Sequence, residues 1–573
     1  MAFWFSLVYL QINKIVLMDE NPKMDNYFQD TISKIYGDDD DFVVIGLTGR
    51  TGSGCSTVAN ILSSGQEDIR HSLFSGHNPK DNIQRKQKVV FNCFEHNWTP
   101  FITIQASTVL LLMLSEVSVE DAGVFIGRSG DLEAGIAKNT TDILKSIRDE
   151  PLVVDDISSL RRFYTEFLPE KNSELKAVMS GAAYVKLFQL IGNNLRNSGS
   201  VTSGEIVSGK LFSLAERINI IIKEIRKARS SGDKTFIVID AIRNPFEAIY
   251  FQDRYSSFYL MAVSCNDDER KRRLRGLGYT DAQIDVVDNE EYGKLDATNQ
   301  KSYVKQDIKA CLQRADLHVS NPDSGNVVSH FNSLADQLLT FVALMVRPGL
   351  VTPTPLERCM QMAYTAKLNS GCISRQVGAV VTDANFSVQS VGWNDTPFGQ
   401  VPCSLRNRFD LINGYDQEAY SEYEKLDLKF ISAVGAGNEK FVKVASTGRN
   451  ISYCFKDEYN NLTGKGNQVH TRSLHAEENA FLQIAKYGGR GVEDGKLFTT
   501  ASPCELCSKK AYQLGIKEIY YIDPYPGIAM SHILMGGSRN PKLVIFFGAI
   551  GRAFHNLYSP KLSFKDELNA LSL

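Results

Sequence analysis

The sequence has 573 residues, of which 43% are apolar and 23% charged. This composition is typical of globular proteins and excludes a chain that is mainly disordered, collagenous or coiled coil. Lys and Arg number 63 and Asp and Glu 66, so the formal net charge is only −3. Proteins that coat nucleic acid usually carry a basic domain or stripe, and no DNA-binding surface is evident in this sequence. The length allows about four domains of roughly 150 residues, or two larger ones.

Residues 1–17 are strongly apolar, but they lack the basic start and the small-residue cleavage site of a signal peptide. Polar residues interrupt them, and the segment is too short for a transmembrane helix. They are either the product of an upstream start codon or a short strand or helix that packs on the core. Residues 1–41 are taken as an N-terminal extension. Because the ten cysteines are spread thinly, we expect a cytoplasmic protein without membrane contact.

The first predicted domain covers residues 42–346 and alternates apolar strands with helical segments. DFVVIGLTG at 41–49 is a short β-branched run that ends in glycine, which indicates a buried strand entering a turn. Helical patterns and polar loops follow over 56–230, and buried strands are expected at 235–240 and 258–264. Strands that alternate with helices predict a mainly parallel sheet.

A glycine-rich loop connects the first strand to the first helix. Its sequence, GLTGRTGSGCST, has the glycine spacing of a phosphate-binding P-loop in the strand–loop–helix context that the motif needs. Backbone N–H groups of such a loop and the positive end of the following helix bind phosphate. Cys55 stands where the motif has lysine, so we predict nucleotide binding without efficient phosphoryl transfer; the alternative is a plain glycine turn. The candidate nucleotide-binding residues are Gly49, Arg50, Thr51, Gly52, Ser53, Gly54, Cys55, Ser56 and Thr57.

Three further segments fit a P-loop domain. Asp240 ends a predicted strand, which is a Walker-B-like position, and Arg243 follows it closely. The segment ADLHVSN at 315–321 resembles the last strand of dephospho-CoA and nucleoside-monophosphate kinases. A basic helix, which is either a lid over the nucleotide or a solvated surface, carries Arg270, Arg272 and Arg273.

The Pro- and Gly-rich segment 347–355 is interpreted as a linker to a second domain at 356–573. Within that domain, 398–469 is polar and irregular and is interpreted as an insertion. The regular elements expected here are a pair of strands at 377–383 and 387–393, a helix at 475–487, a strand at 496–502, a helix at 504–515 and a strand at 517–523.

The most informative motif is H-A-E at 475–477, followed by P-C-E-L-C at 503–507. Two cysteines at i and i+3 on one helical turn face a single ion, and a histidine from another helix adds a third ligand. Three ligands leave the fourth position of zinc open, as a catalytic site requires, whereas a structural site would need a fourth ligand. We predict His475, Cys504 and Cys507 as zinc ligands, in the pattern of zinc nucleobase deaminases.

Glu477 lies two residues after the histidine and is not needed as a ligand. Zinc lowers the pKa of a bound water toward about 7. We predict that Glu477 accepts the proton of this water, that hydroxide attacks C4 of a cytosine, and that Glu477 then protonates N3 and the leaving amine. Ammonia departs and a uracil product remains.

The segment SGCISRQVGAVVTDANFSVQSVGWNDTPFG, with HAEENA and PCELC, resembles the deoxycytidylate deaminase family over most of 356–573 apart from the insertion. The resemblance implies that Asn394, in the G-W-N-x-x-P motif, contacts the nucleotide, and it maps Asn479 onto the family's H-A-E-x-N-A pattern. Arg375 is either a phosphate contact or a surface arginine. Three residues that we expect to be scattered core or loop residues, although they could form an accessory metal site, are Cys372, Cys403 and His470.

The order of the two domains resembles that of the bacterial anti-phage dCTP/dCMP deaminases, in which G-C-[ST] also stands at the lysine position. The resemblance implies an α/β protein in which a P-loop kinase-like parallel-sheet domain precedes a three-layer α/β/α cytidine-deaminase-like domain. It implies Zn²⁺, a nucleoside triphosphate at the P-loop, and conversion of dCTP and dCMP to dUTP and dUMP, which drains deoxycytidine nucleotides during infection. It also implies gating by the P-loop domain, a homo-oligomer, and an inhibitory element such as a small RNA.

Three alternatives stay open at this point. The chain could be a housekeeping dCMP deaminase that supplies dUMP, or a nucleotide-sensing regulatory protein whose deaminase site only binds ligand. The intact motif at 475–477 and 503–507 argues against the second of these, because a sensor would not need Glu477. A deaminase that edits nucleic acid is the third alternative, and the near-neutral charge disfavours it.

Overall fold

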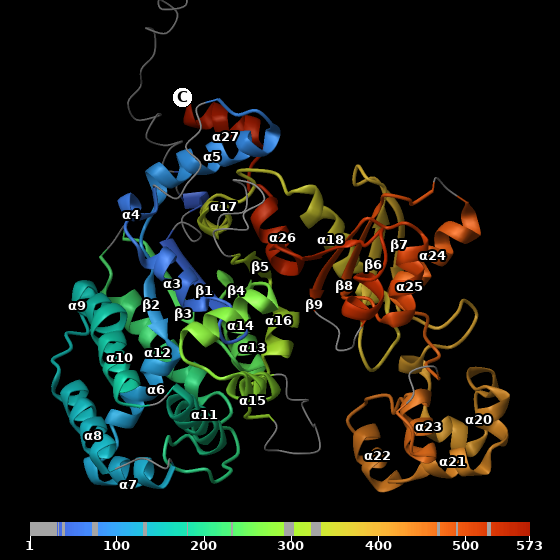
Figure 1. Cartoon of the computed structure of the whole chain (residues 1–573), viewed down its shortest axis with the longest axis horizontal. Helices are drawn as coiled ribbons and strands as arrows, with labels where there is room; N and C mark the ends of the chain where they lie inside the picture. Colours follow the sequence, from blue (N-terminus) through green and yellow to red (C-terminus); the bar gives the residue numbers. More distant parts are fainter. Residues whose placement is uncertain are drawn as a thin grey trace, which may run out of the picture. The chain divides into compact units, whose positions relative to one another are not determined.

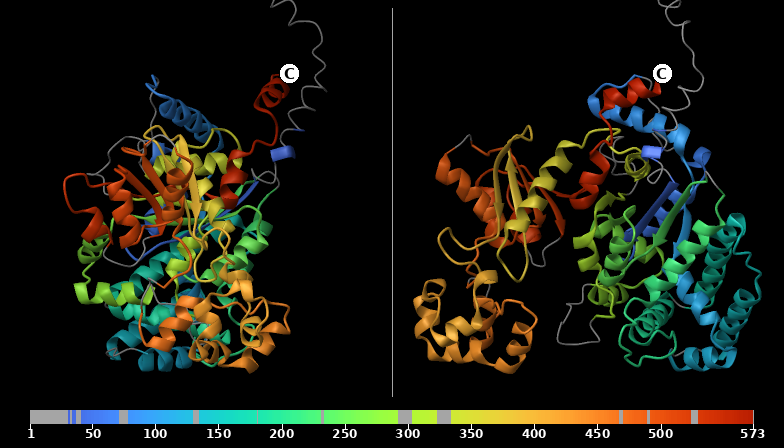
Figure 2. Two further views of the ribbon diagram at one scale, coloured as in Figure 1. Left: turned by 90° about the vertical axis from the view of Figure 1, so that its right-hand side faces the viewer. Right: turned by 180° about the vertical axis from the view of Figure 1, so that it is seen from behind.

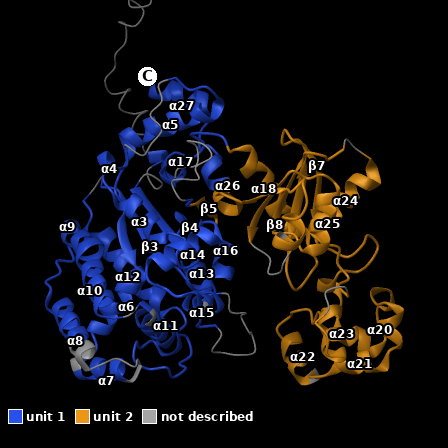
Figure 3. Cartoon of the chain, viewed as in Figure 1, with its two compact units in different colours: residues 1–314, 321–352, 555–573 blue, residues 315–320, 353–554 orange. Residues whose placement is uncertain are grey.

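The computed structural model divides the chain into two compact units (Figure 3). Unit 1 comprises residues 1–314, 321–352 and 555–573, and unit 2 comprises 315–320 and 353–554. The main division, between Thr352 and Pro353, falls inside the segment 347–355. The residues that the structure describes are 31, 34–36, 41–70, 78–129, 134–179, 181–230, 233–291, 303–322, 334–466, 470–488, 491–523 and 529–572. Residues 1–17, interpreted above as a start-site artefact or a packed segment, lie outside them.

The four strands of unit 1 lie side by side in the order β4-β1-β3-β2 (Figure 1). β1 pairs in parallel with both β3 and β4, and β2 pairs in parallel with β3, so the predicted parallel sheet is confirmed. Strands covered on both faces are apolar at nearly every position, which is why these short runs were visible in the sequence. The strands are β1 (Phe42–Thr48), β2 (Ile102–Gln105), β3 (Thr235–Asp240) and β4 (Phe258–Ser264).

Helices cover this sheet, and one strand lies among them where only helices were expected. β2 is four residues long and runs directly into α6, so its apolar residues merge with the helical pattern that follows. The helices of unit 1 are α3 (Cys55–Ser63), α4 (Gln66–Arg70), α5 (Asn82–Asn97), α6 (Ala106–Ser115), α7 (Val119–Ser129), α8 (Ala134–Asp149), α9 (Ile157–Arg161), a π-helix (Arg162–Phe167), α10 (Leu168–Val178), α11 (Gly181–Ser198), α12 (Ser213–Ala228), α13 (Pro245–Arg254), α14 (Asp267–Gly276), α15 (Asp281–Glu291), α16 (Ile308–Arg314), α17 (Leu334–Val346) and α27 (Phe564–Leu571).

Unit 2 is built on a five-stranded sheet in the order β10-β9-β8-β6-β7. The three strands from β8 to β10 are parallel, and β6 runs antiparallel to β7 and β8, so the predicted strand pair is confirmed. Two further strands, β5 and β11, pair with each other in antiparallel orientation. The strands are β5 (Leu317–Ser320), β6 (Gly378–Thr382), β7 (Val388–Trp393), β8 (Lys496–Ala501), β9 (Glu518–Asp523), β10 (Lys542–Ile545) and β11 (Gly548–Ala549).

Helices pack on both faces of the five-stranded sheet and make three layers (Figure 1). On one face, α18 (Pro355–Ala366) packs against Val380 and Phe498. On the other face, α24 (Ala476–Tyr487) and α25 (Glu505–Gln513) pack against alternate residues of the same strands. These two helices are the ones that carry the H-A-E and P-C-E-L-C motifs. Unit 2 ends at Phe554, within a further helix, α26 (Gly551–Tyr558).

The described part of the insertion, residues 398–466, is not irregular, which corrects the sequence-based expectation for 398–469. It forms a cluster of short helices beside the sheet of unit 2 (Figure 2). The cluster has its own apolar core, which includes Phe430 and Val434, and a buried ion pair between Arg406 and Glu424. Polar capping residues and charged outer faces concealed the helical pattern. The helices are α19 (Arg408–Asn413), α20 (Glu422–Leu426), α21 (Leu428–Gly435), α22 (Asn438–Ala445) and α23 (Phe455–Thr463).

The end of the chain returns to unit 1 and packs near its beginning. The Tyr36 hydroxyl donates to the Glu567 carboxylate at 3.1 Å, and the Lys561 ammonium donates to the carbonyl of Ile35 at 2.8 Å. The guanidinium of Arg347 lies over the ring of Tyr36. Among the described residues, none of the helices has the length and apolar character needed to cross a membrane.

Candidate active site and glycine loop

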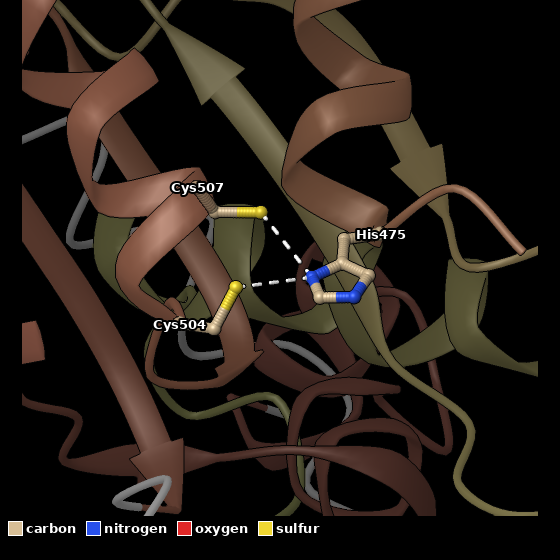
Figure 4. Close-up of side chains that lie close together, drawn as sticks. All are labelled: His475, Cys504 and Cys507. Carbon is tan, nitrogen blue, oxygen red and sulfur yellow. Dashed lines mark hydrogen bonds between the residues drawn. The ribbon is translucent and has the colours of Figure 1, made fainter. Parts of the chain in front are cut away.

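His475, Cys504 and Cys507 bring three metal-ligating atoms together in unit 2 (Figure 4). The Nδ1 atom of His475 lies 3.2 Å from the Sγ atom of Cys504 and 3.4 Å from that of Cys507. They are the one group of three or more His, Cys, Asp or Glu side chains with converging ligand atoms in the described part of the chain. The residues predicted as zinc ligands from their spacing therefore meet in space.

The two helix starts explain this convergence. His475 and Cys504 are the N-cap residues of α24 and α25, and their carbonyls accept the N–H groups of Asn479 and Ser508 at 2.8 Å. Gly392 of β7 allows α24 to approach closely, because a Cβ atom there would lie 2.3 Å from the carbonyl oxygen of Ala476. The positive ends of both helices point toward the ligand atoms and stabilise negative charge there.

The electrostatics of the cluster favour a thiolate. The hydrogen bond from Cys507, together with His475, lowers the pKa of Cys504 to about 3, against the opposing effect of burial. The hydrogen bond to Cys504 raises the pKa of His475, and the hydrogen bond with Cys504 and burial raise that of Cys507. These shifts place negative charge on the sulfur of Cys504 beside two further ligand atoms, and a divalent cation binds such a group with release of protons.

The donor set fits zinc. Bond lengths of about 2.3 Å to sulfur and 2.0 Å to nitrogen in a tetrahedron place ligand atoms roughly 3.5–3.8 Å apart. The observed separations of 3.2 and 3.4 Å are within a few tenths of an ångström of that spacing. Two sulfurs and one nitrogen are the ligands that zinc prefers, and a set of three leaves one position for water or substrate.

Glu477 lies beside this cluster with only 4% of its surface exposed. Burial raises the pKa of its carboxyl group, and the charges of His475 and Cys504 act on it directly. The hydroxyl of Thr499 lies 3.1 Å from Oε1 of Glu477 and 2.7 Å from the carbonyl oxygen of Ala501. Thr499 therefore fixes the orientation of Glu477, a contact that the sequence motif does not reveal.

The two asparagines expected at the substrate have structural partners. Oδ1 of Asn394 accepts the N–H of Val377 at 2.6 Å, and its Nδ2 donates to the carbonyl of Arg375 at 2.7 Å. Nδ2 of Asn479 donates to the carbonyl of Trp393 at 2.9 Å. Asn394 thus shapes the loop before β6, and Asn479 ties α24 to the end of β7.

Residues 353–523 match the family model described as cytidine and deoxycytidylate deaminase zinc-binding region. These residues contain the ligand cluster and Glu477. The region is a deaminase domain. The chain is therefore an enzyme, and the family description supports zinc as its metal.

Individual relatives align with the same region. The deoxycytidylate deaminase of Enterobacteria phage T2 is 28% identical over 166 residues, which cover 29% of this chain and 78% of the relative. That of phage T4 is 29% identical over 167 residues, or 29% of this chain and 76% of the relative. The crystal structure of dCMP deaminase from cyanophage S-TIM5 in complex with dCMP and dUMP is 23% identical, covers 33% of this chain and 95% of its own, and has a TM-score of 0.21.

Other polar residues singled out in the sequence have separate positions. Arg375 forms an ion pair with the buried carboxylate of Asp523 at the end of β9. Cys403 is buried at the start of the insertion, and Cys372 is half-buried. The ring of His470 lies 4.7 Å from that of Tyr459, between ring centroids. His470 therefore packs on α23 of the insertion.

The glycine loop, residues 49–57, connects β1 to α3 in unit 1. Gly52 and Gly54 have backbone φ angles of 87° and 106°, which residues that carry a Cβ atom rarely adopt. Gly54 is also the N-cap of α3, so the loop ends at the positive pole of a nine-residue helix. Asn321 and Arg273 both donate to the carbonyl of Ser53 and hold the loop in place.

The position of the missing lysine is neutral. Burial, with the nearby charge of Asp240, raises the pKa of the Cys55 thiol to about 12. The neighbouring Ser56 hydroxyl donates to Oδ2 of Asp240 at 2.8 Å. The loop hydroxyl and the Walker-B-like carboxylate are thus in contact. Arg243 is close enough to Cys55 and Asp240 to lower the pKa of both groups, and it brings a positive charge near the position where the motif has lysine.

The basic helix α14 lies against the loop, and two of its arginines are structural. Arg270 is 1% exposed and donates to the carbonyl of Thr51. It also pairs with Asp288 of α15 at 2.7 Å. Arg273 donates to the carbonyls of Ser53 and Asn321. These arginines therefore hold the backbone carbonyls of the loop at Thr51 and Ser53.

Proposed function

We propose that this enzyme hydrolyses the exocyclic amine of deoxycytidine nucleotides and converts dCMP, dCTP or both to dUMP and dUTP. The observation that carries the proposal is the convergence of His475, Cys504 and Cys507 beside the buried carboxyl of Glu477. The names of the phage relatives support the deoxycytidine nucleotide as substrate.

Each residue has a task that follows from its position. His475, Cys504 and Cys507 would hold Zn²⁺, which when bound lowers the pKa of a water molecule toward about 7. Glu477 accepts a proton from the attacking water and donates it to N3 of the cytosine ring. It then takes the second proton from the hydroxyl added at C4 and passes it to the leaving amine, which departs as ammonia. Burial holds the pKa of Glu477 above that of an ordinary carboxyl group, so that it can return the proton that it takes. Thr499 keeps the carboxylate in one orientation.

The test is an assay of the purified full chain with dCMP, dCTP, cytidine and a single-stranded oligodeoxynucleotide. We expect release of ammonia and formation of a uracil nucleotide from dCMP or dCTP. No release from either nucleotide contradicts the proposal. Deamination of the oligonucleotide alone would favour a nucleic-acid editing enzyme, and activity on dCMP alone would favour a housekeeping role.

We further propose that the glycine loop binds a nucleotide and that the loop domain gates the deaminase. Support comes from the parallel sheet, the loop at the carboxyl end of β1 and the contact between Ser56 and Asp240. Cys55 makes phosphoryl transfer inefficient, so binding rather than turnover is the expected activity of the loop. Deaminase rates measured with and without ATP or GTP test the gating directly. If the loop domain controls the deaminase, the rate should change when the nucleotide is added.

The resemblance to bacterial anti-phage enzymes supports a role in which deamination drains dCTP during infection. An oligomer and an inhibitory element such as a small RNA belong to the same proposal. Bacteria that express the chain should lose dCTP after phage infection and produce fewer plaques, and a Glu477→Ala chain should do neither. Equal dCTP levels in the two strains would contradict the defence role without affecting the proposed reaction.

A further inference from the structure

The carboxylate of Glu291 lies on the glycine loop, where the loop would bind an anion. Glu291 is the last residue of α15 and is fully buried. Both its oxygens lie 3.1 Å from the backbone nitrogen of Thr51, and its Oε1 also accepts the Thr51 hydroxyl. A carboxylate that accepts a loop N–H and a loop hydroxyl shows that this end of the loop selects negative charge.

Arg243 completes the group. Its Nη1 atom lies 2.7 Å from Oε1 of Glu291 and 3.2 Å from the hydroxyl of Thr51. Arg243 follows β3, and the N–H of Ile242 bonds to the carbonyl of Leu47, so the arginine is held beside the end of β1. It also faces Cys55, the position from which a P-loop lysine reaches the β- and γ-phosphates. The positive charge that is absent at Cys55 is thus supplied from β3 and is paired with Glu291.

We propose that Glu291 is an internal substitute for the outer phosphate of a nucleotide, and that a polyphosphate binds the glycine loop by displacing this carboxylate and taking over Arg243 and the Thr51 N–H. The inference rests on the proposed function, in which the loop binds a nucleotide. It adds the residue that provides the cation and the residue that competes for the site.

The negative charges around the loop disfavour simultaneous binding of the Glu291 carboxylate and a polyphosphate at the same place. Asp240, Asp267 and Asp288 also lie on or near the loop. Arg50 pairs with Asp267 and Asp288, and Arg270 pairs with Asp288. Asp240 accepts the hydroxyl of Ser56. A polyphosphate would bring further negative charges to the same place, and like charges without solvent between them repel strongly. Either Glu291 leaves or the outer phosphates are excluded. A nucleoside monophosphate lacks those phosphates and does not compete with Glu291.

Displacement would act on α15. Asp288, one turn before Glu291, pairs with Arg50 of the loop at 2.8 Å and with Arg270 of α14 at 2.7 Å. The end of α15 is therefore attached to the loop at two residues, Asp288 through Arg50 and Glu291 through Thr51, and the Glu291 contact is the one that a phosphate would replace. Loss of that contact links the occupancy of the loop to the position of the helix.

The test uses calorimetry to measure how tightly four probes bind to the full chain. Three are the Mg²⁺ complexes of ATP, GTP and inorganic tripolyphosphate, and the fourth is AMP. Glu291→Gln keeps the shape and removes the charge, so polyphosphates should bind at least about tenfold more tightly, with AMP unchanged. Asp285→Asn, which removes an exposed charge of the same helix, is the matched control and should change binding less than about twofold.

A second pair of variants tests the origin of the cation. Arg243→Gln should weaken polyphosphate binding by about tenfold or more, since it removes the charge that faces the outer phosphates. Cys55→Lys in the Arg243→Gln background should restore binding, because it returns a lysine to the position that the motif uses. Failure of this rescue overturns the assignment of Arg243.

The outcomes separate the inference from the function on which it rests. If the wild-type chain and all variants bind none of the probes, nucleotide binding by the loop is wrong and the inference falls with it. If the wild-type chain and Glu291→Gln bind polyphosphates equally, loop binding stands and only the displacement of Glu291 is overturned.

Discussion

The two sites of this chain treat buried charge in opposite ways. In the deaminase domain, His475, Cys504 and Cys507 place their ligand atoms within 4.8 Å of one another. The negative charge of this group favours binding of a metal cation. At the glycine loop, the chain's own carboxylate on Glu291 already meets the anion-binding groups. The first site thus needs a metal ion to be complete, whereas under the proposal above a ligand of the second site would displace part of the protein.

The largest expected effect tests the deaminase side of this comparison. Replacement of Glu477 by Ala should lower turnover of dCMP or dCTP by about 10⁴-fold, since it removes the group that carries protons in both directions. Metal analysis should show the same zinc content as the wild-type chain, because the three ligands remain. Glu478→Gln, on the adjacent position and paired with Lys510, is the control and should keep most of the activity.

The second prediction concerns the loop. With a neutral thiol at Cys55, hydrolysis of ATP or GTP should be at least about 10³-fold slower than the 1–100 per second that is usual for kinases. A phosphate-release assay on the purified chain measures this rate. Hydrolysis at a kinase-like rate would show that Arg243 replaces the lysine in transfer as well as in binding.

A smaller effect is expected from the contact between Thr499 and Glu477. Thr499→Val keeps the shape of the side chain and removes the hydroxyl, so kcat should fall by about tenfold while KM stays nearly constant. Thr499→Ser keeps the hydroxyl and should recover most of the rate. A parallel loss in both variants would assign Thr499 to packing alone.

A residue of the active site or the glycine loop could be predicted only where its chemistry fixes the residue type and its spacing in the sequence. His475, Glu477, Cys504 and Cys507 were found because zinc chemistry fixes residue types and spacing on two helix starts. Thr499 carries no such constraint, since a strand residue that contacts a carboxylate looks like any other β-branched position. Glu291 was invisible for a different reason. Its partners Thr51 and Arg243 are 240 and 48 residues away in sequence.

The same contrast holds for the fold. The strands 42–48, 235–240 and 258–264 were predicted to within a residue because they are covered on both faces and apolar at nearly every position. The helices of 398–469 were missed, because a small core needs few apolar residues and its capping boxes, such as Ser421 with Glu424, resemble loop composition.

The smallest expected effect is a change of stability with pH that is caused by His318, a buried residue that stays neutral instead of binding a partner of opposite charge. Burial lowers its pKa to about 4, with Lys367 opposing the charged form. Between pH 6.5 and 4 the unfolded chain binds a proton that the folded chain refuses, so stability should fall as the pH falls through this window. The slope contributed by this residue is at most about 1.4 kcal/mol per pH unit. Urea unfolding at pH 7 and 5.5 measures it, and His318→Gln should flatten the difference.

The return of the chain to unit 1 has a consequence for biosynthesis. Glu567 and Lys561 contact Tyr36 and Ile35, although more than 500 residues are translated between them. The deaminase domain at 353–523 therefore leaves the ribosome before the partners that close unit 1 exist. A nascent chain can thus hold the deaminase domain while unit 1 still lacks α27. A nonsense mutation between residues 555 and 561 would leave the zinc ligands and Glu477 in place but remove Lys561 and Glu567, which contact residues near the start of the other unit.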